Sequence, residues 1–516
     1  MFPSRNTNLW LPVTRRQLLL GGALVLAGAA IDRTTAADGR LFSLGVASGE
    51  PLSDGFVLWT RLAPLPLGGG GMPPKPVEVA WEVATDEGLS RVVQRGTAMA
   101  LPEWGHSVHI EVSGLEPERI YWYCFRSGGE VSPVGRTRTA PAPGALPKAL
   151  KFAFCSCQHY EAGYYTAYRD MAQKDLDFVV HLGDYIYESG QTVGKPRRHD
   201  GSEIRTLTEY RNRYALYRSD PDLQAAHAAF PWIVTWDDHE FSNNYAGDIP
   251  ENSTDAADFL KRRAIAYQAY YENMPLRRSQ MPVGANLQLY RRLSFGQLAQ
   301  FHVLDTRQYR SDQPCGDHLK PLCPETLSPT ATMTGIAQEQ WLFEGLTRST
   351  AGWNILAQQV VFSRFDVDPR PNSTAFNMDQ WDGYVAARNR LLGAIAERKP
   401  ANPIVLSGDV HSSWVFDLKR DFEKPDSPTI GTEFVGTSIS SEFSKNIVGL
   451  LRQALPTNPH TRFFDGEHRG YTICTITPKQ WTSEYRAVAD ATIPNSTVST
   501  LATFVVEAGK PGAIQA

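Results

Sequence analysis

The stretch Asp177-Phe-Val-Val-His-Leu-Gly-Asp-Tyr-Ile-Tyr-Glu188 is the part of the chain around which we expect the fold to be organised. Its first part, Phe178 to Leu182, is a short apolar run with the length of a buried strand. The run stops at Gly183 and is followed at once by Asp184. Open α/β sheets bind ligands beyond the carboxyl ends of their strands, so Asp184 stands where chemistry tends to occur. The alternative is an aspartate that only caps the next turn.

Three further apolar runs end in groups that can bind a metal ion. They are Phe152-Ala-Phe-Cys-Ser-Cys157, Ile233-Val-Thr-Trp236 before Asp237-Asp-His-Glu240 and Asn243-Asn244, and Ile404-Val-Leu-Ser-Gly408 before Asp409-Val-His411. Residues two apart in extended chain face the same side, so Asp409 and His411 can reach one centre. One such strand end is weak evidence. Four in one domain favour a site built around shared ions.

The chain around these strand ends contains two regions with different patterns of predicted secondary structure. Residues 41–140 read as short strands separated by turns, and Leu115–Tyr121 resembles the corner of a fibronectin type III domain, where a tyrosine bonds back to upstream backbone. We expect a small β-sandwich there, followed by a proline-rich linker at 141–147. From 150 to about 500, apolar strands alternate with helical patterns at 163–174, 208–217, 256–271, 338–349 and 383–399, which predicts an α/β domain.

The N-terminus has the pattern of an export signal. Thr14-Arg-Arg-Gln-Leu-Leu-Leu20 is a twin-arginine motif, and the apolar run from Leu18 to Ile31 is too short to span a bilayer. We expect residues 1–37 to be a twin-arginine signal peptide, with an uncleaved anchor as the alternative. This predicts the twin-arginine export machinery as a partner, a periplasmic or secreted location, and a mature protein without a transmembrane helix.

Composition and cysteine spacing add two limits. The formal net charge is −4 and 21% of the 516 residues are charged, which describes an ordinary globular protein and argues against a nucleic-acid-binding module. Cys315 and Cys323 lie close together in a chain expected to reach an oxidising compartment, so we predict a local disulfide. Cys124, Cys155 and Cys474 lie in apolar runs and are expected to be buried thiols.

Three motifs, taken in order, resemble those of the calcineurin-like metallophosphoesterases. They are Gly-Asp-x-x-Tyr at 183–187, Asp-Asp-His-Glu at 237–240 and Gly-Asp-Val-His at 408–411. Cys157 at the first strand end, and Asp409 where purple acid phosphatases have histidine, narrow the resemblance to the PhoD-type alkaline phosphatases. It covers most of the mature chain, including 381–384 and 436–440. The resemblance implies a core of two sheets packed as a β sandwich and flanked by helices, preceded by a fibronectin-III-like β-sandwich domain.

The resemblance also implies two metal ions that share Asp184. Fe3+ is implied at a set of mixed donors: Cys157, Asp184, Tyr187 and His411. Ca2+ is implied at a set of oxygen donors: Asp184, Asp238, Asn244 and Asp409. The residue chemistry agrees, because thiolate, phenolate and imidazole suit iron, whereas oxygen donors suit calcium. Asp237 in place of Asp238, and Asn243 in place of Asn244, remain alternatives.

The implied activity is that of a secreted metal-dependent phosphohydrolase, an alkaline phosphatase with phosphodiesterase activity. A metal-bound hydroxide or a bridging oxide would attack the phosphorus of a phosphomonoester or phosphodiester. We expect Arg388 to clamp the phosphate and His239 to act as general acid or to orient a ligand. Arg307 and Arg310 are assigned no chemistry. The alternatives are an iron–zinc acid phosphatase of the purple type and a non-enzymatic, calcium-stabilised binding module.

Overall fold

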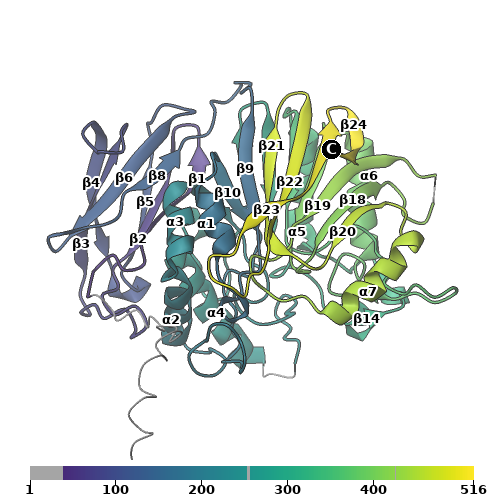
Figure 1. Cartoon of the computed structure of the whole chain (residues 1–516), viewed down its shortest axis with the longest axis horizontal. Coiled ribbons are helices and arrows are strands. Elements are labelled where there is room, and N and C mark those ends of the chain that lie inside the picture. The colour runs from purple at the N-terminus through teal and green to yellow at the C-terminus, as the bar shows by residue number, and fades with distance from the viewer. Residues whose placement is uncertain (1–38, 253–255, 425) are drawn as a thin grey trace, which may run out of the picture. The chain divides into compact units, whose positions relative to one another are not determined.

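The computed structural model describes residues 39–252, 256–424 and 426–516 (Figure 1). The predicted signal peptide, residues 1–37, lies outside this part of the chain. Within the described ranges, no helix has both the length and the apolar character needed to cross a membrane.

The larger sheet has ten strands, of which the four central ones run parallel. In spatial order the strands are β24 (Lys510–Gln515), β23 (Val498–Glu507), β22 (Gln480–Val488), β21 (Arg469–Ile476), β9 (Leu150–Cys155), β10 (Phe178–His181), β11 (Pro231–Val234), β1 (Val46–Leu52), β2 (Gly55–Arg61) and β5 (Ser107–Val112). Strands β10 and β11 are buried along their whole length, as central strands covered on both faces require. The carboxyl ends of β9, β10 and β11 therefore lie at one edge of the sheet.

The smaller sheet has seven strands and, like the larger one, contains four neighbouring parallel strands. In spatial order they are β12 (Arg291–Phe295), β13 (Ala299–Val303), β15 (Trp353–Ala357), β17 (Pro403–Ser407), β19 (Thr429–Val435), β18 (Ser413–Lys419) and β20 (Thr461–Asp465). Strands β13, β15, β17 and β19 run parallel. Short pairs and turns complete the domain: β14 (Leu319–Lys320) pairs with β16 (Phe376–Asn377), and single 3₁₀ turns lie at Pro102–Trp104, Tyr160–Ala162, Arg278–Gln280, Pro314–Gly316, Pro324–Leu327 and Leu455–Thr457.

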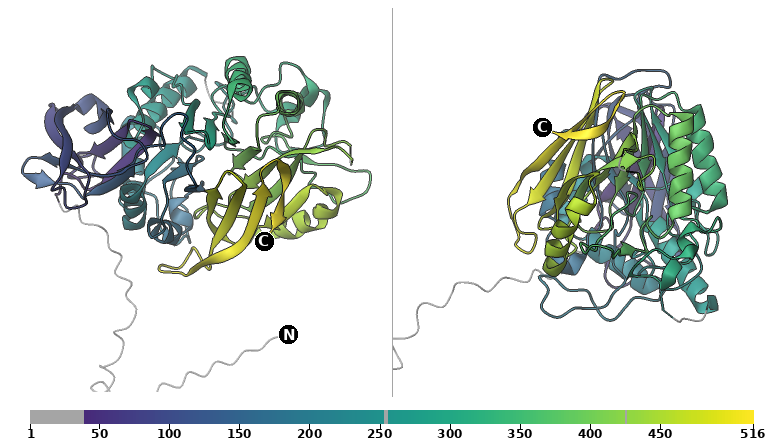
Figure 2. Two further views of the ribbon diagram at one scale, coloured as in Figure 1. Left: turned by 90° about the horizontal axis from the view of Figure 1, so that it is seen from above. Right: turned by 90° about the vertical axis from the view of Figure 1, so that its right-hand side faces the viewer.

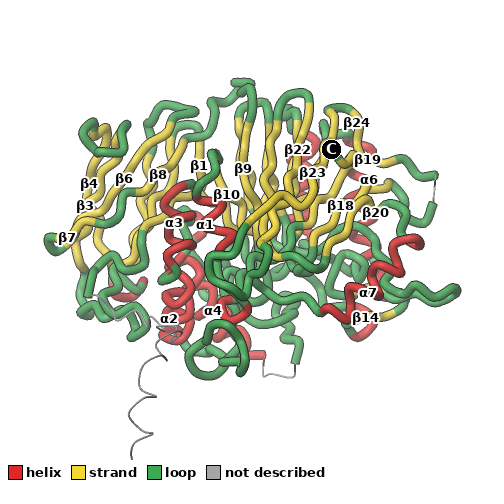
Figure 3. Tube along the Cα trace, viewed as in Figure 1, coloured by secondary structure: helices red, strands yellow, loops and turns green. Residues whose placement is uncertain are grey.

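The two sheets pack face to face and helices lie over part of the outer face of each (Figures 2 and 3). Phe301 of the smaller sheet lies 5.2 Å from Phe152 and 5.4 Å from Phe178 of the larger one, measured between ring centroids. The helices on the larger sheet are α1 (Thr166–Ala172), α2 (Leu207–Arg218), α3 (Pro221–Ala229) and α4 (Ala256–Asn273). Those on the smaller sheet are α5 (Gly335–Arg348) and α6 (Val385–Arg398), with α7 (Lys445–Ala454) packed beside β18 and β20. The predicted two-sheet α/β core is confirmed.

The N-terminal part forms the predicted β-sandwich. Its second sheet consists of β4 (Val92–Ala100), β3 (Val77–Ala84), β6 (Ile120–Ser127), β7 (Glu130–Val131) and β8 (Gly135–Arg138). The hydroxyl of Tyr121 accepts a hydrogen bond from the backbone N–H of Glu116 at 3.0 Å, which is the expected tyrosine corner. Strand β1 pairs with β11, with Ser48 opposite Pro231, so the other sheet of the sandwich continues into the ten-stranded sheet. Residues 39–516 thus form one compact unit.

Candidate metal centre

Residues that follow six parallel strands meet at one place, three from each sheet. They are Cys157 after β9, Asp184 after β10 and Asp238 after β11, with Arg307 after β13, Gln359 after β15 and Asp409 after β17. Parallel strands deliver their carboxyl ends to the same edge, so the topology gathers side chains as far apart in the chain as Cys157 and Asp409. The structure therefore brings together all four strand ends that the sequence singled out.

The residues implied for the ferric ion lie within reach of one ion. The ligand atoms of Cys157, Asp184 and His411 are all within 4.8 Å of one another. The Tyr187 hydroxyl donates a hydrogen bond to Asp184 Oδ2 at 2.7 Å and lies 3.2 Å from His411 Nε2. Sulfur, phenol, imidazole and carboxylate therefore face a common point, which is the donor set that a transition metal accepts.

A second group of oxygen atoms adjoins the first. The carboxylates of Asp237, Asp238 and Asp409 approach within 4.8 Å of one another, and Asp238 also comes this close to Asp184. Asp237 is paired with the Nε of Arg307. Asp238 Oδ1 and Asp184 Oδ1 are buried and have no hydrogen-bond partner among the described residues. Buried carboxylate oxygens without a partner are costly, so these two fit a bound cation, and Asp238 is better placed than Asp237 to bind it.

The choice between the two neighbouring asparagines also has a geometric basis. The backbone N–H of Asn244 donates to Asp238 Oδ2 at 2.7 Å, and Asn244 lines a pocket of about 280 Å³ together with Asp409. The side-chain amides of both asparagines donate to Glu251, at 2.9 Å from Asn243 and 3.2 Å from Asn244, but Asn243 is not among the residues that line this pocket. The arrangement favours Asn244 as the ligand.

Five of the predicted ligands have a left-handed backbone, which residues other than glycine rarely adopt. The φ angles are 58° at Cys157, 57° at Asp184, 48° at Asn244, 63° at Asp409 and 53° at His411. Each such residue costs on the order of 1 kcal/mol, and the cost persists only where surrounding contacts impose the conformation. The reversed backbone turns each side chain out of the strand direction and towards the shared centre.

Burial and neighbouring charges shift the pKa values of the predicted ligand side chains. Burial, with the carboxylates of Asp184 and Asp409, raises the pKa of the Cys157 thiol well above its usual range. Burial and Asp184 do the same to the pKa of the Tyr187 phenol. Burial also raises the pKa of Asp409 to about 6, although Arg307 opposes the shift. A thiolate and a phenolate therefore form here only when a cation is bound, and the residues present fit such an ion.

Arg307 belongs to the centre, although the sequence analysis assigned it no chemistry. Its guanidinium is fully buried, and Nη1 lies 2.9 Å from Asp379 Oδ1 while Nη2 lies 3.4 Å from Asp409 Oδ1. Gln380 donates to Asp409 Oδ2 at 2.7 Å. One signal was available: Arg307 follows β13 much as Asp184 follows β10. For Asp379 and Gln380, which lie on a loop, the strand pattern holds no such signal.

His239 is held against both ligand sets. Its Nδ1 lies 2.7 Å from Glu188 Oε2, and its ring centroid is 4.1 Å from that of Tyr187. Burial opposes the charged imidazole, but the carboxylates of Glu188, Asp238 and Asp184 outweigh it and hold the pKa of His239 well above its usual range. The structure thus places His239 at the centre with a proton available, and it adds Glu188, to which the sequence analysis assigned no role.

The structure does not bring Arg388 to the centre. Its side chain is buried in α6, pairs with Asp382 and lies 5.3 Å over the ring of Phe422. The helical stretch on which Arg388 was expected does form as α6, but Arg388 pairs there with Asp382 rather than with the carboxylates at the strand ends. The expected phosphate clamp therefore lacks a geometric basis. The guanidinium groups beside these carboxylates are those of Arg307, paired with Asp237 and Asp409, and of Arg310, paired with Asp379.

Comparisons with known proteins agree with this geometry. Residues 152–485 match the family described as PhoD-like phosphatase, and residues 28–141 match its N-terminal domain. The chain is 53% identical over 477 residues to alkaline phosphatase D of Bacillus subtilis (strain 168), covering 91% of this chain and 82% of that protein. A solved structure titled "Structure of PhoD" superposes with a TM-score of 0.89 at 52% identity, covering 92% of each chain.

Proposed function

This chain belongs to the PhoD-like phosphatase family and is a metal-dependent phosphoric ester hydrolase, and from that premise we propose that its centre uses one Fe3+ and one Ca2+ to hydrolyse phosphomonoesters and phosphodiesters. The observation that carries this proposal is the approach of Cys157, Asp184 and His411 to within 4.8 Å of one another, with Tyr187 beside them. Fold alone would not support it, because many folds serve several chemistries.

The donor atoms support the two ions that we propose. Thiolate, phenolate and imidazole are ligands for iron, and the thiolate disfavours an ion that prefers oxygen alone. Asp238, Asn244 and Asp409 offer only oxygen once Asn244 binds through its carbonyl, which suits calcium. The carboxylate of Asp184 belongs to both sets and would hold the ions together. When bound, two adjacent cations neutralise the charge of the phosphate and lower the pKa of a water molecule.

The residues of the chain supply the positioning and the proton. Glu188 accepts from His239 Nδ1, so the imidazole is fixed in orientation and its Nε2 is the nitrogen that can deliver a proton to the leaving alkoxide. Arg307 places one positive charge among four carboxylates and limits their mutual repulsion. The twin-arginine motif at Arg15 and Arg16 supports export to the periplasm or beyond, and that machinery moves folded proteins, which suits an enzyme loaded with metal before export.

Elemental analysis of the native protein, paired with rates on p-nitrophenyl phosphate and bis(p-nitrophenyl) phosphate, tests the proposal. We expect iron and calcium, turnover of both esters, and loss of both metals and of activity in Asp184→Asn. The control Asp54→Asn, on the exposed turn between β1 and β2, should keep them. Iron with zinc, and activity that survives a calcium-selective chelator, would favour the purple type instead. If neither ester is hydrolysed under any metal loading, the result would favour the alternative of a non-enzymatic, calcium-stabilised binding module.

A further inference from the structure

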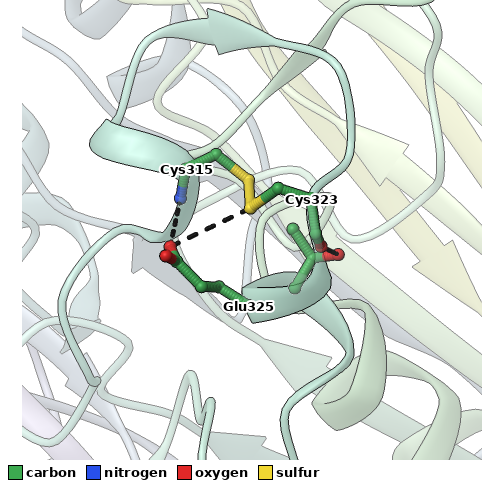
Figure 4. Close-up of a disulfide and its surroundings, with 4 residues drawn as sticks. Cys315, Cys323 and Glu325 are labelled. Carbon is green, nitrogen blue, oxygen red and sulfur yellow. Dashed lines mark hydrogen bonds between the residues drawn. A yellow bond between two sulfur atoms is a disulfide. The ribbon is translucent and has the colours of Figure 1, made fainter.

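A loop closed by a disulfide borders the metal centre. The bond between Cys315 and Cys323 confirms the predicted pair and closes the loop formed by residues 312–328, which we call the disulfide loop (Figure 4). The backbone N–H of Cys315 donates to Glu325 Oε2 at 2.7 Å across its base. The three thiols expected to be buried, in contrast, are free and buried.

The disulfide loop is hydrogen-bonded to residues of the centre at two places. Before the disulfide, Gln313 Nε2 donates to the carbonyl oxygen of Asn244 at 2.6 Å and to Asp379 Oδ1 at 2.9 Å. Within the loop, β14 pairs with β16, and His318 accepts a backbone hydrogen bond from Met378 at 3.0 Å. These bonds connect the loop to the segment that carries Asp379 into the centre.

The tip of the loop has a strained backbone. Four consecutive residues, 315–318, have positive φ angles of 59°, 74°, 64° and 65°, and only Gly316 among them adopts this conformation without cost. Asp317, His318 and Leu319 of this tip line the pocket of about 280 Å³. Asn244, Asp379 and Asp409 of the metal centre line the same pocket. Strain at a position that faces the centre indicates a functional constraint on the loop.

We propose that the disulfide loop is the substrate-binding wall of this enzyme, and that His318 and Leu319 contact the organic group of the phosphate ester. The inference rests on the proposed function. Phosphorus has to lie over the ions, at the inner end of the pocket, so the ester's alcohol portion points outward to the loop. The His318 side chain is 73% exposed, with its Nδ1 3.7 Å from Asp317 Oδ2, and Leu319 is 49% exposed, so both are accessible to a ligand. Imidazole supplies a hydrogen bond and leucine an apolar surface.

Steady-state kinetics of His318→Ala with the two p-nitrophenyl esters tests this assignment. We expect KM to rise about tenfold for both esters, the factor that loss of one hydrogen bond worth about 1.4 kcal/mol gives, with kcat within about twofold of the wild type. The inhibition constant of inorganic phosphate, which lacks an organic group, should stay the same. The matched control is Leu322→Ala, because Leu322 lies in the same loop and is exposed but does not line the pocket.

A second variant tests the disulfide itself. Cys315→Ser with Cys323→Ser should raise KM in the same direction while the iron and calcium contents stay unchanged. Unchanged KM values in His318→Ala, an equal rise in the inhibition constant of phosphate, or loss of metal from the double cysteine variant would each overturn the assignment. Failure of the wild-type enzyme to hydrolyse either ester would instead refute the proposed function, so the two failures are distinguishable.

Discussion

Two cysteines two positions apart illustrate how much depends on the single residue. Cys155 is the last residue of β9, and its sulfur lies 3.8 Å from the hydroxyl of Tyr168 in the core under α1. Cys157 has left the strand direction with a φ of 58°, and its sulfur faces Asp184 and His411. Burial raises the pKa of Cys155 to about 12. One thiol is therefore an inert part of the core, whereas the other is placed to bind a cation.

Substitution of Cys157, but not of Cys155, should lower the iron content of the protein. Cys157→Ser removes the soft donor, so we expect the iron content to fall by at least half and any thiolate-to-iron visible band to disappear. Cys155→Ser, buried beside it, should keep both and lose about 1 kcal/mol of stability at most. Metal analysis and absorption spectra of the two purified variants check this. An unchanged spectrum and iron content in Cys157→Ser would refute the ferric assignment.

At the scale of elements, the turns that follow the parallel strands pack against one another. Gly183, after β10, has a φ of 118°, and a Cβ at this position would lie 2.5 Å from the Cβ and the backbone nitrogen of Asp237, after β11. The carboxylate of Glu240 accepts from the backbone N–H groups of Asp184 at 3.0 Å and Asp237 at 2.9 Å. One carboxylate thus joins two turns, and the ligands that they carry are positioned as a unit.

The close approach at Gly183 predicts a clear difference between two glycine substitutions. Gly183→Ala introduces a clash with backbone and an unfavourable φ, so we expect a loss of about 2–4 kcal/mol in the free energy of unfolding, together with weaker metal binding. Gly393→Ala, in the middle of α6 with nothing within 4 Å of the added Cβ, should gain about 1 kcal/mol. Urea unfolding of both variants measures the difference. Equal stabilities would contradict the packing described for the turn.

At the scale of the whole molecule, two packed sheets with helices on both outer faces bury several histidines far from solvent. His302 on β13 and His181 on β10 are fully buried. Burial lowers the pKa of each to about 3. In the unfolded chain histidine takes up a proton near pH 6.5, so below this pH the unfolded state binds more protons than the folded state. Stability is therefore complete above pH 6.5 and falls as the pH decreases towards 3.

His302 allows this acid sensitivity to be measured at one residue. Between pH 7 and pH 5, each buried neutral histidine should lower the free energy of unfolding by about 2 kcal/mol. His302→Gln keeps an acceptor for Arg292 Nε, 3.2 Å from the ring in the wild type, and should reduce the loss by that amount. The exposed His318→Gln should leave it unchanged. Urea unfolding at pH 7 and pH 5 measures the free energy of unfolding of each variant. If this free energy depends on pH identically in wild type and His302→Gln, the prediction is wrong.

Local patterns of apolar residues in the sequence predict most of the secondary structure. The helical periodicity at 208–217 and 383–399 corresponds to α2 and α6 within two residues at either end. Helix α3, Pro221–Ala229, was not predicted, although Asp220 accepts from the backbone N–H of Asp222 and a proline occupies the first turn, which together are a recognisable start signal. Short helices carry too few apolar repeats for periodicity to detect them.

The sequence by itself determined which strand ends carry sulfur, imidazole and carboxylate donors, because apolar runs and the residues that follow them are local features of the chain. Only the tertiary structure decided how these groups are used. It paired Arg307 with Asp237 and left Asp238 Oδ1 without a hydrogen-bond partner among the described residues, buried Arg388 against Asp382, and placed the disulfide loop beside Asn244. Contacts between residues far apart in the chain depend on how the two sheets pack, and no local pattern encodes that packing.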